Sequence, residues 1–285
     1  MKLLTFGVIQ PSIMSDHIPQ REPSPPAATS NPIERSLNAA SQVGAGTPYF
    51  KLTKTLTYSY IFVLPLIILY ELGISLINSG SVSQIRIGAD ILVKRFLNFV
   101  GLEGTLWLSA LLVAVGVAII IYERRLRTPI RPRYFLYMFG ESMAYGIVIG
   151  MAVATFVTQL FSLTWPPTLQ IAGQTSLLQG LILSLGAGVY EELVFRLILV
   201  SALVGVMRFI PIGDKARYIV AALVGALIFS GVHYIGELGD PFDLASFTFR
   251  FLMGLALNAL YLTRGFGIAA MTHALYDVLV TLVQR

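Results

Sequence analysis

The chain has 285 residues, of which 55% are hydrophobic and only 12% are charged, and its mean hydropathy is +0.75. Soluble globular proteins carry roughly 25% charged residues, so this composition excludes an ordinary soluble domain. The absence of cysteine excludes disulfides, thiol catalysis and Cys-containing zinc sites. The net charge of +5 comes largely from arginines in short loops, which indicates membrane orientation and no nucleic-acid partner.

The first 50 residues differ from the rest of the chain in composition. They are rich in Pro, Ser, Ala, Asn and Gln, and Pro23, Pro25 and Pro26 lie close together. Such a segment buries too little apolar surface to fold by itself. We therefore predict a disordered tail over residues 1–50. Its apolar patch at 1–9 is too short for a signal-peptide core, so we expect no cleavage there.

Beyond the tail, long apolar runs alternate with short polar stretches. A helix needs about 20 apolar residues to cross the hydrocarbon of a bilayer, and the alternating pattern of a β-barrel is absent. We therefore predict an all-α, polytopic transmembrane helix bundle of about seven spans. These spans fall at 56–76, 105–122, 134–161, 177–200, 218–235, 247–262 and 266–283.

Two membrane regions follow the tail, one at 51–165 and one at 177–285. Within the first, the segment 85–100 mixes apolar and charged positions, which favours either an interfacial amphipathic helix or a plain extramembrane helix. Arginines crowd the connection at 124–133, and the positive-inside rule places that connection and the N-terminus in the cytoplasm. We expect an integral protein of the cell (inner) membrane, with the lipid bilayer as a partner.

Ionisable side chains within the apolar segments gather in the C-terminal half. Placing a charge at the middle of a span costs about 2.5 kcal/mol or more, so such residues mark a functional site. They form three groups, which are Glu191, Glu192 and Arg196, then His233, then His273 and Asp277. The remaining histidine of the chain, His17, lies in the predicted tail.

The spacing of the first group predicts different roles for its two acids. Glu192 and Arg196 are four residues apart and therefore share a helical face, where they form an ion pair that neutralises both charges. Glu191 projects about 100° away from Glu192 and lacks that partner. An unpaired carboxyl in a poorly hydrated site suits a general base or acid near neutral pH.

The two histidines have helical neighbours at the same four-residue interval. Asp277 can orient the imidazole of His273, and the ring of Phe229 can pack beneath that of His233. A lone histidine in an apolar helix is more often a packing residue. An unpaired glutamate combined with two histidines instead indicates a site that activates water and stabilises an oxyanion.

These groups, in this order, resemble the motifs of the CPBP family of intramembrane proteases (CAAX protease and bacteriocin-processing), which includes the type II CAAX prenyl endopeptidases. The family pattern is Glu-Glu-x-x-x-Arg, then Phe-x-x-x-His, then His-x-x-x-Asn or Asp. The matching residues are Glu191, Glu192 and Arg196, then Phe229 and His233, then His273 and Asp277. The match covers residues 177–283, and we expect 177–285 to be the catalytic membrane domain.

The resemblance implies hydrolysis of a peptide bond in a hydrophobic, lipid-modified or membrane-presented substrate. Glu191 would activate water with help from His233, while His273 and Asp277 would complete the site. Glu192 and Arg196 would be the structural pair, and Phe229 would pack at the site.

Two details of this site stay open in the sequence. Asp277 stands where many relatives have Asn, and because an ionised Asp only accepts hydrogen bonds, we favour orientation of His273 as its role. Zinc bound by Glu191, His233 and His273 and a metal-free glutamate mechanism use the same residues, so the sequence does not choose between a metalloprotease and a metal-free enzyme.

Two other functions compete with proteolysis. A proton-coupled transporter would relay protons through the same residues, although the spans show no clear internal repeat. A non-catalytic membrane immunity or scaffold protein is the other. The predicted spans also place Glu191 about 10–15 Å from the cytoplasmic face and His233 nearer the outer face. The site therefore requires a later or tilted fifth span, or a rearranged segment at 196–209.

Overall fold

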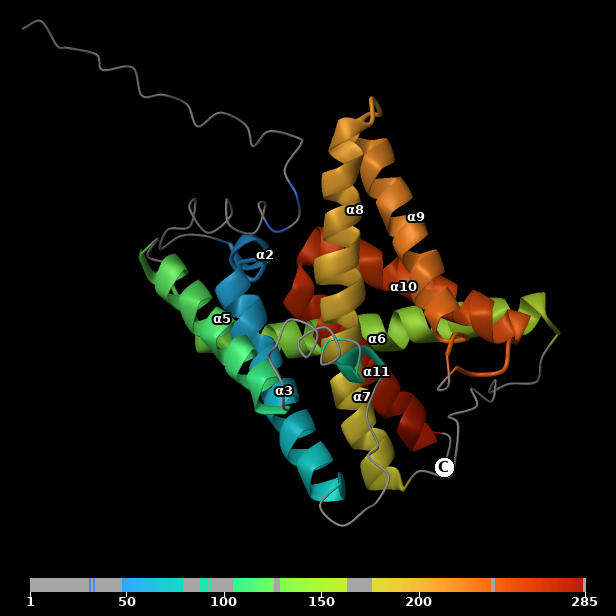
Figure 1. The fold of residues 1–285 in the computed structure, drawn as a ribbon, viewed down its shortest axis with the longest axis horizontal. Helices are drawn as coiled ribbons and strands as arrows, with labels where there is room; N and C mark the ends of the chain where they lie inside the picture. The colour runs from blue at the N-terminus through green and yellow to red at the C-terminus, as the bar shows by residue number, and fades with distance from the viewer. Residues whose placement is uncertain are drawn as a thin grey trace, which may run out of the picture.

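The computed structural model describes residues 31, 33, 48–78, 88–91, 93, 105–125, 129–162, 176–236 and 239–283, with the side chains of 105–112 and 124–125 excepted. Every regular element in these ranges is a helix, which confirms the predicted all-α class (Figure 1). The predicted disordered tail at 1–50 and most of the predicted helix at 85–100 lie outside the described residues.

The elements follow one another in this order: α2 (Tyr49–Leu52), α3 (Leu56–Asn78), α5 (Thr105–Arg125), α6 (Pro132–Leu160), α7 (Leu177–Glu191), η1 (Glu192–Val200), α8 (Ser201–Val206), η2 (Met207–Phe209), α9 (Asp214–Val232), α10 (Leu244–Arg264) and α11 (Phe266–Val283). In the described part of the chain, 5 helices are long and apolar enough to cross a membrane, namely α3, α6, α9, α10 and α11. The predicted count of about seven is therefore not confirmed. The predicted span at 105–122 corresponds to α5, in which Val113–Glu123 is a shorter apolar helix within the described residues. The predicted span at 177–200 corresponds to α7 and η1.

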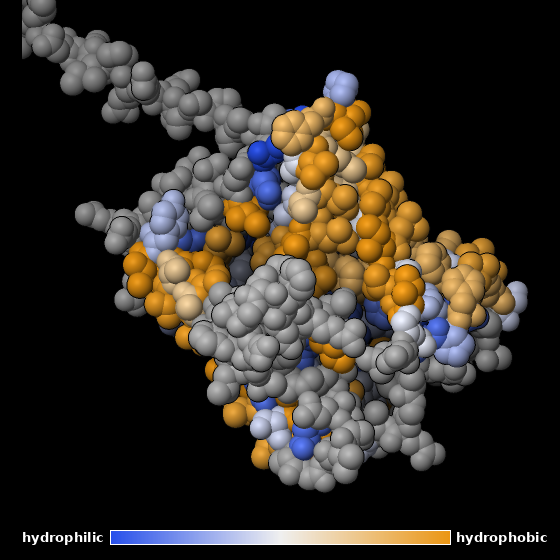
Figure 2. Space-filling model, viewed as in Figure 1, coloured by the Kyte–Doolittle hydropathy of each residue, from blue (hydrophilic) through white to orange (hydrophobic). Residues whose placement is uncertain are grey.

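The outward faces of the bundle are apolar. Figure 2 shows hydrophobic side chains covering the surface of α8 and α9. Large exposed hydrophobic residues of α8, η2 and α9 include Val206, Phe209, Ile219 and Leu227. Soluble proteins rarely expose contiguous apolar surface of this extent, whereas lipid chains are its natural neighbours. The protein is an integral membrane protein.

Helices α7, η1 and α8 follow one another without a break from residue 177 to residue 206 (Figure 1). The predicted end of this span at residue 200 was too early, because the residues at both junctions, Glu192 and Ser201, have helical φ and ψ. The turn therefore lies beyond Phe209, and α9 returns beside α8 and η1. At 1.5 Å per residue α9 travels about 28 Å, which brings His233 to the level of Glu191. Because α7, η1 and α8 form one long continuous helix, Glu191 and His233 lie at similar depth, and the difference in depth that followed from the predicted spans disappears.

Small residues set the distance between α7 and α11, the pair of helices that packs most extensively. A Cβ placed on Gly188 would lie 2.5 Å from the Cβ of Ala274 and 2.7 Å from the carbonyl oxygen of Ala270. Small side chains allow helix backbones to approach this closely in a membrane. Because Gly188 is one turn before Glu191 and Ala274 adjoins His273, this contact also sets the distance between those two functional side chains.

Helix α6 presents a buried stripe of small residues to the rest of the bundle. The stripe consists of Ser142, Gly146, Gly150 and Ala154, spaced four residues apart. The ring of Tyr276, on α11, fills the space beside Gly150, where an added Cβ would lie 2.4 Å from a ring carbon. This contact packs α11 against α6, in addition to its packing against α7.

Arg264, at the end of α10, fastens the N-terminal helices to the C-terminal half. Its Nε and Nη2 donate to the two oxygens of Glu141, on α6, at 2.5 and 2.7 Å, and Nη2 also donates to the Thr53 hydroxyl at 3.2 Å. The hydroxyl of Tyr49, on α2, donates to the same carboxylate at 2.6 Å. Burial and this hydrogen bond to Glu141 raise the pKa of Tyr49. Glu141 therefore joins three helices.

Candidate active site

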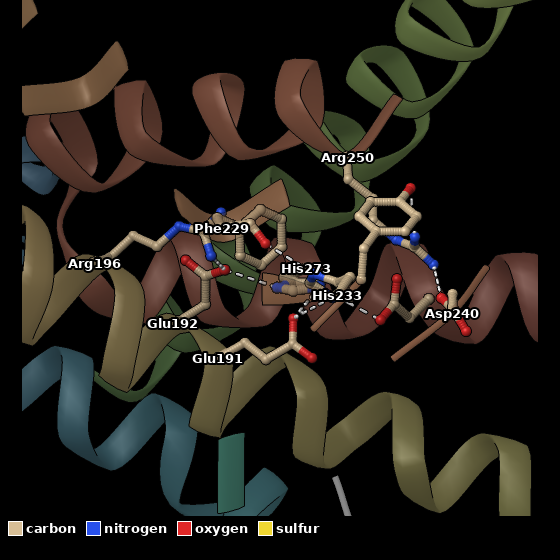
Figure 3. Close-up of polar contacts among 10 residues, drawn as sticks. Glu191, Glu192, Arg196, Phe229, His233, Asp240, Arg250 and His273 are labelled. Atoms are coloured by element: carbon tan, nitrogen blue, oxygen red, sulfur yellow. Dashed lines mark hydrogen bonds and ion pairs between the residues drawn. The ribbon is translucent and has the colours of Figure 1, made fainter. Parts of the chain in front are cut away.

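Glu191 is the last residue of α7, and its carboxylate faces both histidines of the predicted site (Figure 3). Its Oε2 atom lies 3.9 Å from Nε2 of His233 and 3.9 Å from Nε2 of His273. These distances are too long for direct hydrogen bonds, but a single water molecule can bridge groups separated in this way. The fold thus brings together three polar side chains from α7, α11 and the end of α9.

His233 caps the C-terminus of α9, and its ring is oriented by that helix. Nδ1 lies 2.8 Å from the carbonyl oxygen of Phe229. Because a carbonyl only accepts hydrogen bonds, Nδ1 is the donor, and Nε2 of the neutral ring keeps a lone pair that faces Glu191. The Phe229 ring packs edge-on against the imidazole, with 5.0 Å between ring centroids.

His273 lies between two carboxylates besides Glu191. Its Nδ1 is 2.7 Å from Oε1 of Glu192, and its Nε2 is 3.4 Å from Oδ2 of Asp277. The sequence assigned the orientation of this ring to Asp277, but Glu192 makes the shorter contact. An ionised Glu192 only accepts hydrogen bonds, so Nδ1 donates to it and Nε2 is directed toward Glu191 and Asp277.

A fully buried network supports Glu192 from behind. The Nη1 atom of Arg196 lies 2.8 Å from Oε1 of Glu192, and both side chains are 0% exposed. Nε of Arg196 donates to Oδ1 of Asn258 at 3.1 Å, and the amide of Asn258 donates to the Ala222 carbonyl at 2.7 Å. The guanidinium carbon also lies 4.2 Å from the centroid of the Phe229 ring. The network therefore ties η1 to both α9 and α10.

This ion pair depends more on charge than on aligned hydrogen bonds. Within the described residues, Oε2 of Glu192 and the two terminal nitrogens of Arg196 have no hydrogen-bond partner, although Nη1 is at ion-pair distance from Glu192. Removing two charges from water is costly, and such a pair is often no more stable than apolar residues of similar volume. The pair holds the Glu192 carboxylate where it binds Nδ1 of His273, and this explains why the pair is present.

The helix widens to the π form at Glu192 and keeps that form to Val200. π-helical turns are rare, and they occur frequently at functional sites. Here the change begins at the residue directly after Glu191, so it alters the direction in which Glu192 and Arg196 project relative to α7. Nothing in the spacing of the sequence predicts this change.

A cavity of about 300 Å³ lies on the exposed side of Glu191 and both histidines. Much of its wall is apolar, formed by residues such as Leu183, Ala187, Phe249, Met253, Leu257 and Val280. Asp277 lines the cavity as well, as do Asp240 and Arg250. Asp240 and Arg250 are not among the site residues predicted from the sequence. Arg250 lies within the predicted span at 247–262, so a charge in an apolar run was the signal that could have found it.

Asn258 and Tyr190 are two further residues whose place only the fold reveals. Asn258 is a single amide within an apolar helix, a type of residue that often bonds neighbouring helices in membranes. Tyr190 is fully buried away from the cavity lining, where its hydroxyl donates to Glu71 and its ring lies 5.2 Å from that of Tyr70. These contacts are those of a packing residue.

Glu191, His233 and His273 are the residues predicted to ligate zinc. In the described part of the chain, no group of three or more His, Asp or Glu side chains is arranged to hold one. Bonds of about 2.0–2.2 Å place two ligands of tetrahedral zinc about 3.4 Å apart. The 3.9 Å separations from Glu191 to the two imidazoles exceed this value. The arrangement does not fit zinc, so we derive no catalytic step through a metal. Bound zinc stays a prediction, which metal analysis of the purified protein decides.

Residues 173–279 match the family model described as "Type II CAAX prenyl endopeptidase Rce1-like". The matched range contains all seven residues of the three motifs. No curated protein and no solved structure matches the chain.

Proposed function

We propose that this chain, which belongs through residues 173–279 to the Rce1-like family of type II CAAX prenyl endopeptidases, cleaves its substrate with Glu191 as the general base. The observation that carries this proposal is the position of Glu191 Oε2, 3.9 Å from Nε2 of both His233 and His273. A water molecule in that space would contact the carboxylate and an imidazole lone pair together. Its oxygen would also adjoin the cavity, where a substrate carbonyl can approach.

In the first step, Glu191 takes a proton from this water while the water oxygen attacks the carbonyl carbon of the scissile bond. His233 accepts the second hydrogen of the water through Nε2, because its Nδ1 is committed to Phe229. This arrangement aims an oxygen lone pair of the water at the carbonyl carbon. General-base catalysis of this kind contributes roughly 10²–10⁴-fold to a rate.

In the second step, the tetrahedral intermediate collapses. A protonated Nε2 of His273 would stabilise the oxyanion, with Glu192 holding Nδ1 and Asp277 orienting the ring. The C–N bond breaks, and Glu191 returns its proton to the departing amine nitrogen. Water thus adds hydroxyl to the acyl fragment and hydrogen to the amine, so no oxidant or further reactant is needed.

The cavity wall favours a hydrophobic substrate segment. Apolar side chains from α7, α10 and α11 surround the polar residues, so a lipid-modified or membrane-presented peptide would be desolvated there at low cost. We further propose that the N-terminus lies in the cytoplasm and that the protein resides in the cell (inner) membrane, in accord with the arginines at 124–133.

Replacing Glu191 tests this function directly. We expect Glu191→Gln, which keeps the shape of the side chain but cannot accept the proton, to lower cleavage roughly 10²–10⁴-fold. The measurement uses purified protein in liposomes and a farnesylated peptide whose Cys is followed by two aliphatic residues and Met. Asp214→Asn, far from the cavity at the start of α9, is the matched control and should leave the rate unchanged.

Three results would count against the proposal. Wild-type cleavage by the Glu191→Gln variant removes Glu191 from the role of base. Proton flux through the liposomes without proteolysis favours the proton-coupled transporter instead. Neither proteolysis nor flux, across a panel of lipid-modified and unmodified hydrophobic peptides, leaves the non-catalytic membrane scaffold.

A further inference from the structure

A second ion pair, Asp240 with Arg250, lines the cavity on the side of His233 away from Glu192 and Arg196 (Figure 3). Nη2 of Arg250 donates to Oδ2 of Asp240 at 2.6 Å, and Nη1 donates to the hydroxyl of Tyr234 at 2.8 Å. The Arg250 and Asp240 side chains are 19% and 25% exposed. The backbone N–H of Asp240 also donates to the carbonyl oxygen of His233 at 2.8 Å, so this pair is joined directly to the backbone of His233.

Arg250 has unused capacity to bind an anion. A guanidinium carries five N–H donors in a planar fork that matches a carboxylate. In the described part of the chain Arg250 uses two of them, one on Asp240 and one on Tyr234. Its Nε–H and one hydrogen on each terminal nitrogen have no protein acceptor there. A second carboxylate could therefore bind Arg250 without displacing Asp240.

Arg264, on the same helix, has a purely structural role, and protein acceptors occupy the donors of its guanidinium. Its Nε and Nη2 bind both oxygens of Glu141, and further bonds reach the Thr53 hydroxyl and the Phe50 carbonyl. Its side chain is only 7% exposed. Arg250 differs in three respects, because it binds one carboxylate oxygen, keeps unused donors in the described part of the chain and lines the cavity.

The cavity lining combines Arg250 with three acids, Glu191, Asp240 and Asp277, so Arg250 is the place where an anionic group of a ligand could bind. Among the cavity-lining residues of the described chain, Arg250 is the one lysine or arginine, and much of the wall around it is apolar. A charge within an apolar helix is costly to maintain, so its retention requires a compensating role. Poor hydration also strengthens a charge-assisted bond to an entering carboxylate.

We propose that Arg250 is a specificity-determining residue that binds a carboxylate of the substrate and thereby fixes which peptide bond reaches Glu191. This proposal rests on the proposed function. A substrate supplies a carboxylate either at its C-terminus or on an acidic side chain. In either case the span from Arg250 to Glu191 sets how many residues separate the carboxylate from the scissile bond.

Three farnesylated peptides that differ only at the C-terminal end test this assignment. The first ends in a free carboxylate, the second ends in an amide, and the third is an amide with Glu as its last residue. We expect the wild type to cleave the free acid roughly 10–100-fold better than the plain amide in kcat/KM, mainly through KM. Arg250→Gln should abolish this preference, so that the ratio of kcat/KM for the free acid to kcat/KM for the plain amide falls to about one.

A second variant guards against misfolding. Arg250→Gln leaves Asp240 without its partner, whereas the double variant Asp240→Asn with Arg250→Gln removes both charges together. The double variant should also cleave the free acid and the amide equally. If the third peptide is cleaved like the free acid, Arg250 binds side-chain carboxylates too; if it is cleaved like the plain amide, the chain end is required. Both results support the assignment.

Other results overturn it. Equal cleavage of the free acid and the amide by the wild type removes the role of Arg250 and leaves the proposed function intact. The same holds if either variant keeps the wild-type preference. Absence of cleavage of all three peptides by the wild type, at the level of Glu191→Gln, overturns the proposed function and this assignment with it.

Discussion

The buried side and the cavity side of the site each contain an arginine paired with a carboxylate. On the buried side, Glu192 and Arg196 are 0% exposed and lie against Asn258 and the Phe229 ring. On the cavity side, Asp240 and Arg250 are partly exposed, and Arg250 retains unused donors in the described part of the chain. The same two residue types thus serve different ends, because burial and the number of occupied donors differ.

This difference separates support from recognition. A fully buried pair cannot contact a substrate. Its role is to hold Glu192 against Nδ1 of His273. A pair at the edge of a cavity contributes little to stability, since water and side-chain motion weaken exposed ion pairs. It remains available to a ligand. Stability measurements should therefore detect the first pair, and substrate discrimination should detect the second.

The largest expected effect comes from breaking the buried pair. Arg196→Met removes the cation but keeps much of its volume, and it leaves buried Glu192 with His273 as its one remaining partner among the described residues. Loss of one member of a buried pair costs about 3–5 kcal/mol. We expect the free energy of unfolding, measured in mixed detergent micelles, to fall by that amount. Arg250→Gln is the matched variant on the cavity side and should cost about 1 kcal/mol or less. Equal losses in the two variants would contradict the distinction between the two sides.

A smaller effect on folding, but a large one on activity, is expected at the contact between α7 and α11. Gly188→Ala places a methyl group 2.7 Å from the backbone oxygen of Ala270, which cannot move as a flexible side chain would. The helices must separate, and Glu191 moves away from His273. Misplacement of about 1 Å can cost 10²-fold in rate, and we expect a loss of about that size in peptide cleavage.

Gly205, in α8, supplies the control for this variant. It lies in the same continuous helix formed by α7, η1 and α8, but an added Cβ there would have no neighbouring atom within 4 Å. Gly205→Ala should leave activity unchanged and stabilise the helix by up to about 1 kcal/mol. Similar loss of activity in both variants would mean that the continuous helix of α7, η1 and α8 tolerates a substitution at neither glycine. The α7–α11 contact would then have no special role.

The helical spacing of the sequence was sufficient to predict which side chains meet within one helix. Glu192 meets Arg196, and Phe229 meets His233, because residues four apart share a face. Contacts between helices required the fold. The bond from Glu192 to His273 joins residues 81 positions apart, and Asn258 reaches Arg196 from 62 positions away. No local pattern encodes either of them.

Two features explain why the depth of the site could not be predicted. The hydropathy of the sequence marks where apolar runs occur, but α7, η1 and α8 continue as helix past the predicted boundary at residue 200. The π-helical segment that begins at Glu192 has no counterpart in composition or spacing. Arg250 is a different case, because its charge lies in an apolar run and the rule that selected Glu191 applies to it equally.

The smallest effect is expected at Asp277, which contacts His273 from the cavity side. Its Oδ2 lies 3.4 Å from Nε2 of His273, whereas Glu192 lies 2.7 Å from Nδ1. The longer contact contributes less to holding the ring. In Asp277→Asn the amide oxygen can still accept from Nε2, so we expect kcat for peptide cleavage to fall about 10-fold or less. Glu192→Gln is the comparison, and it should lower kcat further because the closer acceptor loses its charge. A loss in Asp277→Asn as large as that in Glu191→Gln would place Asp277 in the chemical step itself, and the cavity side would then contain a second catalytic carboxylate.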